Sequence, residues 1–348
     1  MLAGKSTSLD YSTDGEPGIA RIARKGCVTF RSPSGREIRG VRTLKRIAAL
    51  AIPPAWTDVW ICNNPKGHIQ AIGKDARGRK QYRYHLEWVA ERHSSKFDSL
   101  YEFGRVLPRI RRRVNADLAL PLLSKRRVLA AIVQLMDQVF IRVGGERYRR
   151  DNGSFGVTTL RSSHVRVAGS EVVLDFRGKS GKRHQLELDD TRVATVVRKC
   201  LDLPGATLFQ YREGDAVRTI SAGDVNEYLR LVSGSAITSK DFRTWGGTVC
   251  ATRHLAKESR RATTSEKRGH VRQAVRAAAQ LLGNTPAVCR KSYIHPLVLS
   301  NYERGMIAPS MHIEGLRAGE RVVMGLLAHQ RKVAARHPAT TQASVGRG

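Results

Sequence analysis

The sequence predicts an α+β protein in which a small, sheet-rich N-terminal domain is followed by a larger, mainly helical domain. The chain has 348 residues, which is enough for about two domains at roughly 100–200 residues each. Short apolar runs separated by turn sequences fill the chain up to about residue 93, and apolar residues at helical spacing follow. We therefore expect an N-terminal domain at 1–93, a second domain at 94–330 and a disordered basic tail at 331–348.

The N-terminal domain shows the short, turn-bounded apolar segments that are typical of strands. Turn sequences at 32–35 (SPSG) and 63–67 (NNPKG) separate them. A short helix ends before the prolines at 53 and 54, because proline cannot continue a helix. The expected strands are Val28–Phe30, Trp60–Cys62 and Ile69–Ile72, and the expected helix is Val41–Leu50.

The larger domain shows helical periodicity, most clearly at Lys125–Ile141, where apolar residues recur on one face. One β-hairpin interrupts the helices. Alternate residues are apolar at 172–176 and again at 186–188, on either side of the turn sequence RGKSGK. Further helices are expected at Thr191–Cys200, Ala222–Val232, Gly246–His254, Ser265–Leu282 and Leu316–His329.

The charge balance points to a polyanionic partner. Lys and Arg total 61 against 30 acidic residues, which gives a formal net charge of +31 and a pI near 10.9. Such an excess attracts polyanions through counterion release, and nucleic acid is the expected one. An anionic membrane surface is the alternative, but no basic amphipathic helix carries flanking Trp or Phe anchors. No apolar run approaches the roughly 20 residues of a membrane span, and the polar N-terminus lacks an apolar signal core, so we expect a cytoplasmic protein.

Neither the cysteines nor the histidines show metal-ligand spacing. The 5 cysteines are far apart and form no CxxC pair, and the 11 histidines form no HExxH or HxH pattern. We therefore expect reduced thiols rather than disulfides, and neither a metal site nor a cofactor.

Four short stretches supply side chains that together suit phosphodiester chemistry. They are FIRVGGERYRRDNGSFG with Arg142, FRGKSGK with Lys179, KDFRTWG with Arg243 and GNTPAVCRKSY with Tyr293. Two guanidiniums can hold a phosphate, and an amine can protonate a departing sugar hydroxyl. A phenol beside cations can act as a nucleophile. Such a set needs neither a metal nor a nucleotide.

Each of these residues also has an ordinary structural interpretation. Arg142 closes an apolar helix face, where an arginine either extends to solvent at a helix end or forks onto a phosphate. Tyr293 follows two basic residues, but an isolated tyrosine is usually a core or surface aromatic.

The other two candidates have their own alternatives. Lys179 is either part of a solvated basic turn or an amine that enters a nucleic-acid groove, and Lys182 and Arg183 compete with it for that role. Arg243 lies beside a helix start that Ser239 or Asp241 can cap. It therefore either binds phosphate near a helix N-terminus or pairs with Asp241 on the surface.

A basic segment of the N-terminal domain, GKDARGRKQYRYH, interleaves cations with aromatic residues. Basic residues contact phosphates, and aromatic side chains stack on bases or pack against sugars. A run of charges is more often a solvated face, but the net charge of +31 favours DNA binding. The DNA-binding candidates are Lys74, Arg77, Arg79, Lys80, Tyr82, Arg83 and Tyr84, with Tyr148 in the second domain.

In this order, the stretches resemble the type IB DNA topoisomerases, specifically their small poxvirus-like bacterial branch, from about Ile52 to Arg304. The resemblance implies a helical catalytic domain of the topoisomerase IB/tyrosine recombinase type, with the catalytic lysine on a β-hairpin. It also implies an N-terminal domain that clamps double-stranded DNA. A monomer is expected to nick one strand, relax supercoils by swivelling and reseal, without ATP or metal, on the DNA of the bacterial nucleoid.

The resemblance assigns roles position by position. Arg142 and Arg243 match the two catalytic arginines. Lys179 matches the general acid to the 5′-hydroxyl, and Tyr293 matches the nucleophile that forms a 3′-phosphotyrosyl link. Many members have a histidine where this chain has Asn284, in GNTP. An amide can donate a hydrogen bond to a phosphate oxygen but cannot become cationic, so we expect a modest loss of charge stabilisation there.

Two other functions compete with this one. A tyrosine recombinase or integrase shares the catalytic fold and the Arg–Lys–Arg–Tyr set, but typically has HxxR at the second arginine, where this chain has Lys240 in KDFR. A non-enzymatic basic protein that coats DNA explains the charge but does not need Tyr293.

Overall fold

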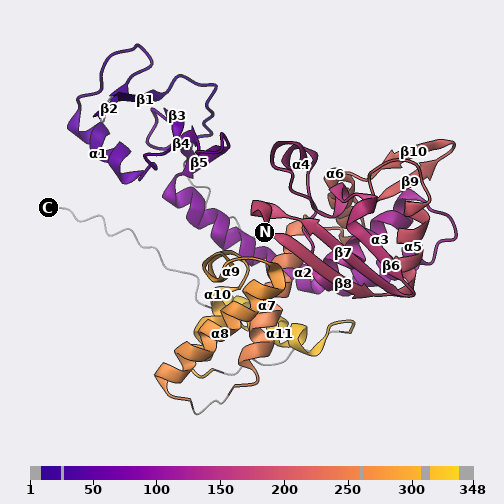
Figure 1. Cartoon of the computed structure of the whole chain (residues 1–348). Helices are drawn as coiled ribbons and strands as arrows, with labels where there is room; N and C mark the ends of the chain where they lie inside the picture. Colours follow the sequence, from indigo (N-terminus) through magenta and orange to yellow (C-terminus); the bar gives the residue numbers. More distant parts are fainter. Residues whose placement is uncertain (1–8, 25–26, 259–261, 307–313, 337–348) are drawn as a thin grey trace. The chain divides into compact units, whose positions relative to one another are not determined.

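The computed structural model describes residues 9–24, 27–258, 262–306 and 314–336. The chain divides into two compact units, Met1–Lys96 and Phe97–Gly348 (Figure 1). The boundary lies inside the 33-residue helix α2 (Leu86–Leu118), which begins in the first unit and ends in the second.

The first unit is built on a five-stranded antiparallel sheet with the order β2-β1-β3-β4-β5. A small core is formed where Ile47 of its helix is buried with Val59, Ile61 and Ala71 of the sheet. Its elements before α2 are β1 (Ile19–Arg24), β2 (Cys27–Arg31), α1 (Val41–Ala49), β3 (Thr57–Ile61), β4 (Ile69–Lys74) and β5 (Lys80–Tyr84).

The three strands and the helix expected in this unit are confirmed as β2, β3, β4 and α1. The sequence did not predict β1 or β5. Strand β5 has the sequence KQYRY, which is part of the segment we interpreted through its charges. It lies at the edge of the sheet and buries no side chain fully, which explains why no apolar alternation marked it.

The second unit is mainly helical and contains a three-stranded antiparallel sheet, β6-β7-β8, and the small hairpin β9-β10 (Figure 1). Helices α3 and α5 pack against the three-stranded sheet. The elements after α2 are α3 (Lys125–Val139), α4 (Glu146–Asn152), β6 (Val165–Ala168), β7 (Glu171–Arg177), β8 (Arg183–Asp189), α5 (Thr191–Leu201), β9 (Gln210–Glu213), β10 (Ala216–Thr219), α6 (Ala222–Ser233), α7 (Ser239–Leu255), α8 (Thr264–Leu282), α9 (Pro286–Ser292), α10 (Pro296–Glu303) and α11 (Ala318–Arg336).

Strands β7 and β8 pair where the alternation predicted two strands, and the residues Lys179–Gly181 lie in the turn between them. The helices expected in this unit are present, but three of their ends differ. Helix α3 ends at Val139 because Phe140 adopts a left-handed backbone with φ 52°. Helix α7 begins at Ser239, well before the expected Gly246.

The third difference concerns the C-terminal tail. Helix α11 continues to Arg336, so the expectation of disorder from residue 331 is wrong for its first six positions. The sequence there, RKVAAR, contains no glycine or proline, and the first proline follows at 338. Residues 337–348 of the predicted tail lie outside the described part of the chain.

Candidate active site

Arg142 lies three residues beyond the end of α3, after the left-handed residue Phe140 has redirected the chain. Ile141 is buried, and Arg142 is half-buried. Its guanidinium Nη2 donates to Oδ1 of Asn284 at 2.5 Å. Arg142 therefore does not extend into solvent at the helix end, and it joins a residue 142 positions away in the sequence.

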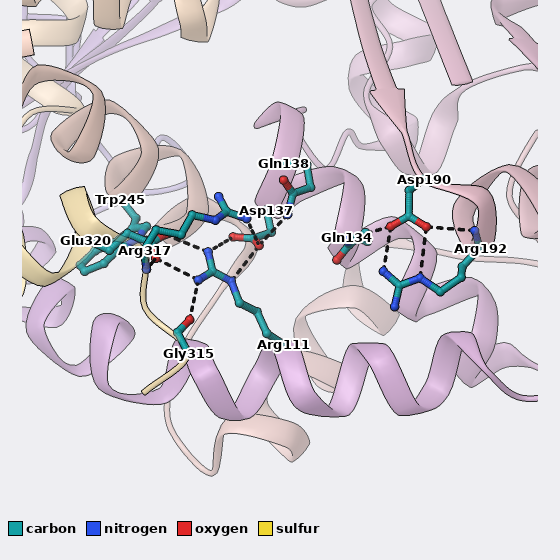
Figure 2. Close-up of polar contacts among 10 residues, drawn as sticks. All are labelled: Arg111, Gln134, Asp137, Gln138, Asp190, Arg192, Trp245, Gly315, Arg317 and Glu320. Atoms are coloured by element: carbon teal, nitrogen blue, oxygen red, sulfur yellow. Dashed lines mark hydrogen bonds and ion pairs between the residues drawn. The ribbon is translucent and has the colours of Figure 1, made fainter. Parts of the chain in front are cut away.

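A buried ion-pair network holds the last turn of α3, the helix that precedes Arg142 in the sequence (Figure 2). Arg111 of α2 donates to Asp137 of α3 at 2.9 Å and to Glu320 of α11 at 2.8 Å. Trp245 of α7 also donates to Glu320, at 3.2 Å. The carboxylates are almost fully buried, with 6% and 3% of their side chains exposed, and each has a cationic partner, as buried charges require.

Arg243 lies in the second turn of α7, and the hydrogen bonds at the start of that helix explain why Asp241 does not pair with it. The carboxylate of Asp241 accepts from the backbone N–H of Thr238 at 2.8 Å and from its hydroxyl at 2.9 Å. Asp241 thus caps the helix, as one of the two predicted capping residues. The alternative in which Arg243 pairs with Asp241 on the surface is wrong, because Arg243 is 6% exposed.

The guanidinium of Arg243 is held by backbone carbonyls. Nη1 donates to the carbonyl of Phe140 at 2.5 Å, and Nη2 donates to the carbonyl of Leu282 at 2.7 Å. Its buried Nε has no hydrogen-bond partner among the described residues. Burial, and then the positive charge of Arg142, lower the pKa of Arg243 to about 10. Arg243 therefore stays charged at neutral pH, and its Nε–H can donate to a ligand.

Tyr293 is the residue that ends α9, and its half-buried ring lies beside Arg243. The ring centroid is 5.3 Å from Cζ of Arg243, in the range of a cation–π contact. The Tyr293 carbonyl accepts from the hydroxyl of Thr248 in α7 at 3.3 Å. A Cβ built on Gly247 would lie 2.6 Å from this same carbonyl, so glycine permits the close approach of α7 to the tyrosine turn.

Lys179 is exposed at the turn between β7 and β8 and lines one pocket together with Arg142 and Arg243. Among the described residues that line this pocket, neither Lys182 nor Arg183 occurs. Arg183 is instead paired with Asp175 across the hairpin at 2.5 Å. The geometry therefore separates Lys179 from the two competing cations of its turn.

Asn284 follows Gly283, the left-handed residue that ends α8 with φ 61°. Its Oδ1 accepts from Arg142, and its buried Nδ2 has no hydrogen-bond partner among the described residues. Asn284 can therefore offer this amide N–H to a ligand.

One residue of this pocket was not singled out from the sequence. His184 of β8 lines it with the two arginines and Lys179. The strand places His184 on the same face as Leu186 and Leu188, and the three are the less exposed residues of β8. The alternation that predicted the strand also carries this signal, because a histidine in register with inward-facing leucines points into the molecule.

The DNA-binding candidates of the first unit do not all present free charges. Lys74 pairs with Asp58 at 2.7 Å, Arg79 with Asp75 at 2.6 Å, and Lys80 with Asp14 at 2.5 Å. Each pairing partly neutralises a cation that was expected to contact phosphate.

Arg77 and the two tyrosines of the same segment are exposed, whereas Arg83 is half-buried. The guanidinium of Arg77 has no hydrogen bond or ion pair within the described chain. Tyr82 and Tyr84 are each 42% exposed, and their rings are stacked with centroids 6.0 Å apart. Arg83 donates to the carbonyl of Ala51 at 2.6 Å. In the second unit, Tyr148 of α4 is 61% exposed.

The described residues contain no group of three or more His, Cys, Asp or Glu side chains that could hold a metal ion. None of the described helices has the length and apolar character needed to span a bilayer. The site has two guanidiniums and an amine that line one pocket, together with an amide and a phenol that contact those guanidiniums. This arrangement is suited to a phosphodiester.

Comparison with known proteins shows which family this chain belongs to. Residues 79–319 match the family model of the eukaryotic DNA topoisomerase I catalytic core. This span covers most of the second unit, including all the residues described in the pocket. The chain belongs to the type IB DNA topoisomerases, a family that acts on double-stranded DNA.

A second family model and individual relatives give a more specific comparison. Residues 28–75 match the N-terminal domain of bacterial DNA topoisomerase IB. The chain is 34% identical over 281 residues to DNA topoisomerase 1B of Acanthamoeba polyphaga mimivirus, covering 78% of this chain and 83% of that protein. It is 23% identical over 231 residues to DNA topoisomerase 1B of Vaccinia virus (strain Copenhagen), covering 66% of this chain and 70% of that protein.

Proposed function

We propose that this DNA topoisomerase cleaves one strand of duplex DNA through a covalent link between Tyr293 and the 3′-phosphate. The observation that carries the proposal is the convergence of distant segments. Arg142, Lys179 and Arg243 line one pocket, and the Tyr293 ring lies 5.3 Å from the Arg243 guanidinium. A cation beside the phenol favours phenolate character as the oxygen attacks.

In the proposed cleavage step, the Tyr293 oxygen bonds to phosphorus while the bond from phosphorus to the 5′-oxygen breaks. The phenol proton passes to solvent, and the Lys179 ammonium gives a proton to the leaving 5′-oxygen. Arg142, Arg243 and the Asn284 amide donate to the non-bridging oxygens, where negative charge develops. These donors are already fixed by the contacts of the free protein, so little reorganisation is needed when DNA binds.

Relaxation then follows from the chemistry of the intermediate. The phosphotyrosyl link preserves the energy of the phosphodiester bond, so the 5′-hydroxyl can attack it in reverse and restore the strand. While the strand is open, torque in the DNA drives rotation about the intact strand. We propose that neither ATP nor a divalent metal takes part.

Binding of the duplex is proposed to involve the first unit as a clamp, through the segment that contains Lys74, Arg77, Arg79, Lys80, Tyr82, Arg83 and Tyr84, and the second unit through Tyr148. The exposure of Arg77, of the stacked tyrosines and of Tyr148 supports these contacts. We further propose that the protein acts as a monomer, in the bacterial cytoplasm on nucleoid DNA, because one copy supplies all five catalytic side chains.

The deciding experiment combines adduct trapping with Tyr293→Phe. Wild-type protein is incubated with supercoiled plasmid that has no special site, with EDTA and without ATP, and is then quenched with denaturant. We expect stepwise relaxation and a covalent protein–DNA adduct from wild type, and neither from Tyr293→Phe. Tyr101→Phe makes the same chemical change elsewhere in the second unit and is expected to behave as wild type.

The other outcomes select the competing functions. An adduct that forms only on a defined DNA site, without plasmid relaxation, would indicate a tyrosine recombinase. DNA binding with no adduct from any variant would indicate a non-enzymatic basic protein. An adduct from Tyr293→Phe would remove Tyr293 as the nucleophile.

A further inference from the structure

The imidazole of His184 is wedged between the two turns that carry Lys179 and Asn284. On one side, the ring stacks on Phe176, its partner across the β7–β8 pair, with centroids 5.5 Å apart and planes at 20°. At its edges it meets two glycines, each of which directly precedes one of the proposed catalytic residues.

The contacts to these glycines are close. A Cβ built on Gly178 would lie 2.5 Å from ring carbon Cδ2 and 2.8 Å from Nε2, and a Cβ built on Gly283 would overlap Cε1. Gly178 precedes Lys179, and Gly283 precedes Asn284. His184 therefore sets the separation between the turn of the proposed general acid and the turn of the proposed phosphate donor.

The ring also holds an unused polar atom. Nε2 of His184 is buried and has no hydrogen-bond partner among the described residues. Burial, followed by the positive charges of Arg142, Arg243 and Lys182, lowers the pKa of His184. A neutral imidazole has one N–H and one acceptor nitrogen. Nε2 of His184 can therefore act as a hydrogen-bond acceptor in a pocket whose other polar side chains are mostly donors.

Lys179 is a donor that could pair with this acceptor nitrogen. Among the cations lining the pocket, Arg142 has Asn284 as acceptor and Arg243 has two carbonyls. In the described part of the chain, the Lys179 ammonium has no acceptor. Its flexible four-carbon stem starts one residue from Gly178, whose built Cβ would lie 2.8 Å from Nε2.

From these observations we infer that His184 is a positioning residue for Lys179. Its Nε2 accepts a hydrogen bond from the Lys179 ammonium when DNA is bound, while the ring holds the Lys179 turn against the Asn284 turn. The inference rests on the proposed role of Lys179 as general acid. Nothing is transferred to His184: the imidazole, protonated on Nδ1, keeps the ammonium directed at the 5′-oxygen, and Lys179 delivers the proton.

The test compares two leaving groups at one cleavage site, mapped beforehand by denaturant trapping with wild type. One duplex has the ordinary 5′-oxygen at the scissile phosphate, and the other has sulfur there. A thiolate leaves without protonation, so loss of a general acid slows cleavage of the first duplex but not of the second. Lys179→Ala is expected to slow cleavage of the oxygen duplex by about 10²–10⁴-fold and to recover with sulfur.

His184→Phe keeps an aromatic ring against Phe176 and removes Nε2. It is expected to slow cleavage of the oxygen duplex on the order of 10–100-fold, as misplaced catalytic groups do, and to recover with sulfur. His184→Gln retains an acceptor and is expected to lose less. Addition of His184→Phe to Lys179→Ala should cause little further loss, because the two residues act as one unit. His254→Phe removes another histidine of the second unit and serves as the control.

The outcomes separate the inference from the function on which it rests. An unchanged rate in His184→Phe, or an equal loss with both leaving groups, would overturn the inference. If Lys179→Ala itself did not recover with sulfur, Lys179 would lose its assigned role, and the inference would fall with it. Melting temperatures identify any variant that fails to fold, and His184→Gln then carries the comparison of leaving groups.

Discussion

Arg243 combines a structural and a proposed catalytic role in one side chain. Its two terminal nitrogens donate to the carbonyl of Phe140, directly after α3, and to that of Leu282, at the end of α8. Removing a donor from buried acceptors costs the desolvation penalty of each carbonyl left unpaired. The residue proposed to contact phosphate thus also helps to hold the walls of the pocket in place.

We expect Arg243→Lys to lose cleavage activity and to lower the free energy of unfolding by about 1–3 kcal/mol. A lysine retains the charge, but its compact ammonium cannot reproduce the planar fork that reaches both carbonyls. Urea unfolding of wild type, Arg243→Lys and Lys179→Ala measures the effect. Lys179 is exposed, so its variant should unfold within about 0.5 kcal/mol of wild type. Equal stability of all three proteins would contradict the structural role.

For Asn284, the structure adds a second role to the phosphate-donor role expected from the sequence. Its Oδ1 orients Arg142, and its Nδ2 is left to donate. We expect Asn284→Ala to slow adduct formation by roughly 10²–10³-fold, the usual effect of losing one oxyanion donor. Asn284→Asp should be slower still, because a carboxylate accepts from Arg142 but repels phosphate. Single-turnover adduct formation measures both, and a faster Asp than Ala variant would show that orienting Arg142 matters more than donating.

At the scale of elements, helix α10 has a cap that responds to pH. His295 precedes this helix, its Nδ1 accepts from the N–H of Leu297 at 3.1 Å, and its side chain is 7% exposed. Burial lowers the pKa of His295 to about 4, from the usual 6.5. The folded state therefore resists protonation that the unfolded state accepts, so stability is lost as the pH falls from 6.5 towards 4.

We expect this histidine to remove about 2 kcal/mol of stability between about pH 7.5 and about pH 5. His295→Asn retains a capping acceptor but cannot titrate in this range. Urea unfolding of wild type and His295→Asn at both pH values measures the difference, and other titrating groups cancel in the comparison. Equal pH dependence of the two proteins would mean that His295 is not held neutral.

The elements also show what the sequence does and does not determine. Apolar spacing predicted α3 because Val128, Ile132 and Leu135 bury one continuous face. It predicted only the part of α7 from Gly246 onwards, because the first seven residues of the helix, SKDFRTW, include few strong helix formers. The structure explains both glycines by packing: a Cβ at Gly246 would overlap the Phe140 ring, and one at Gly247 would meet the Tyr293 carbonyl. Such partners are distant in the chain and leave no local pattern.

At the scale of the whole molecule, the net charge of +31 predicts DNA binding that weakens steeply with salt. The structure shows which cations of the first unit are paired with carboxylates. Arg77 is exposed without a hydrogen bond or ion pair to its side chain in the described chain, whereas Lys74 and Lys80 are paired with carboxylates.

We expect Arg77→Ala to weaken binding to a random-sequence duplex and to reduce the slope of log affinity against log salt by about 1. Arg36→Ala removes the same side chain from the β2–α1 connection, outside the basic segment, and should leave the slope unchanged. Fluorescence anisotropy over a range of salt concentrations measures both. Equal changes in the two variants would indicate that the overall charge, not this segment, determines binding.

The members of the candidate site could be proposed from the sequence, but the contacts between them could not. The order of four short stretches identified Arg142, Lys179, Arg243 and Tyr293, because each chemical group appears in the local sequence. The carbonyls that hold Arg243, the bond from Arg142 to Asn284 and the position of His184 depend on tertiary packing. The ion pairs of Lys74 and Lys80 likewise arise from residues elsewhere in the sheet domain.

The two carbonyls that hold Arg243 have an electrostatic consequence. Phe140 caps the C-terminus of α3, and Leu282 is the last residue of α8, so the guanidinium lies where the negative ends of two helix dipoles meet. A carboxylate in their place would have supplied the same hydrogen bonds together with a full negative charge. Partial charges from peptide groups anchor the arginine while leaving the pocket strongly positive. A phosphate that binds as proposed would therefore meet a guanidinium whose charge is not neutralised by a carboxylate of the described residues.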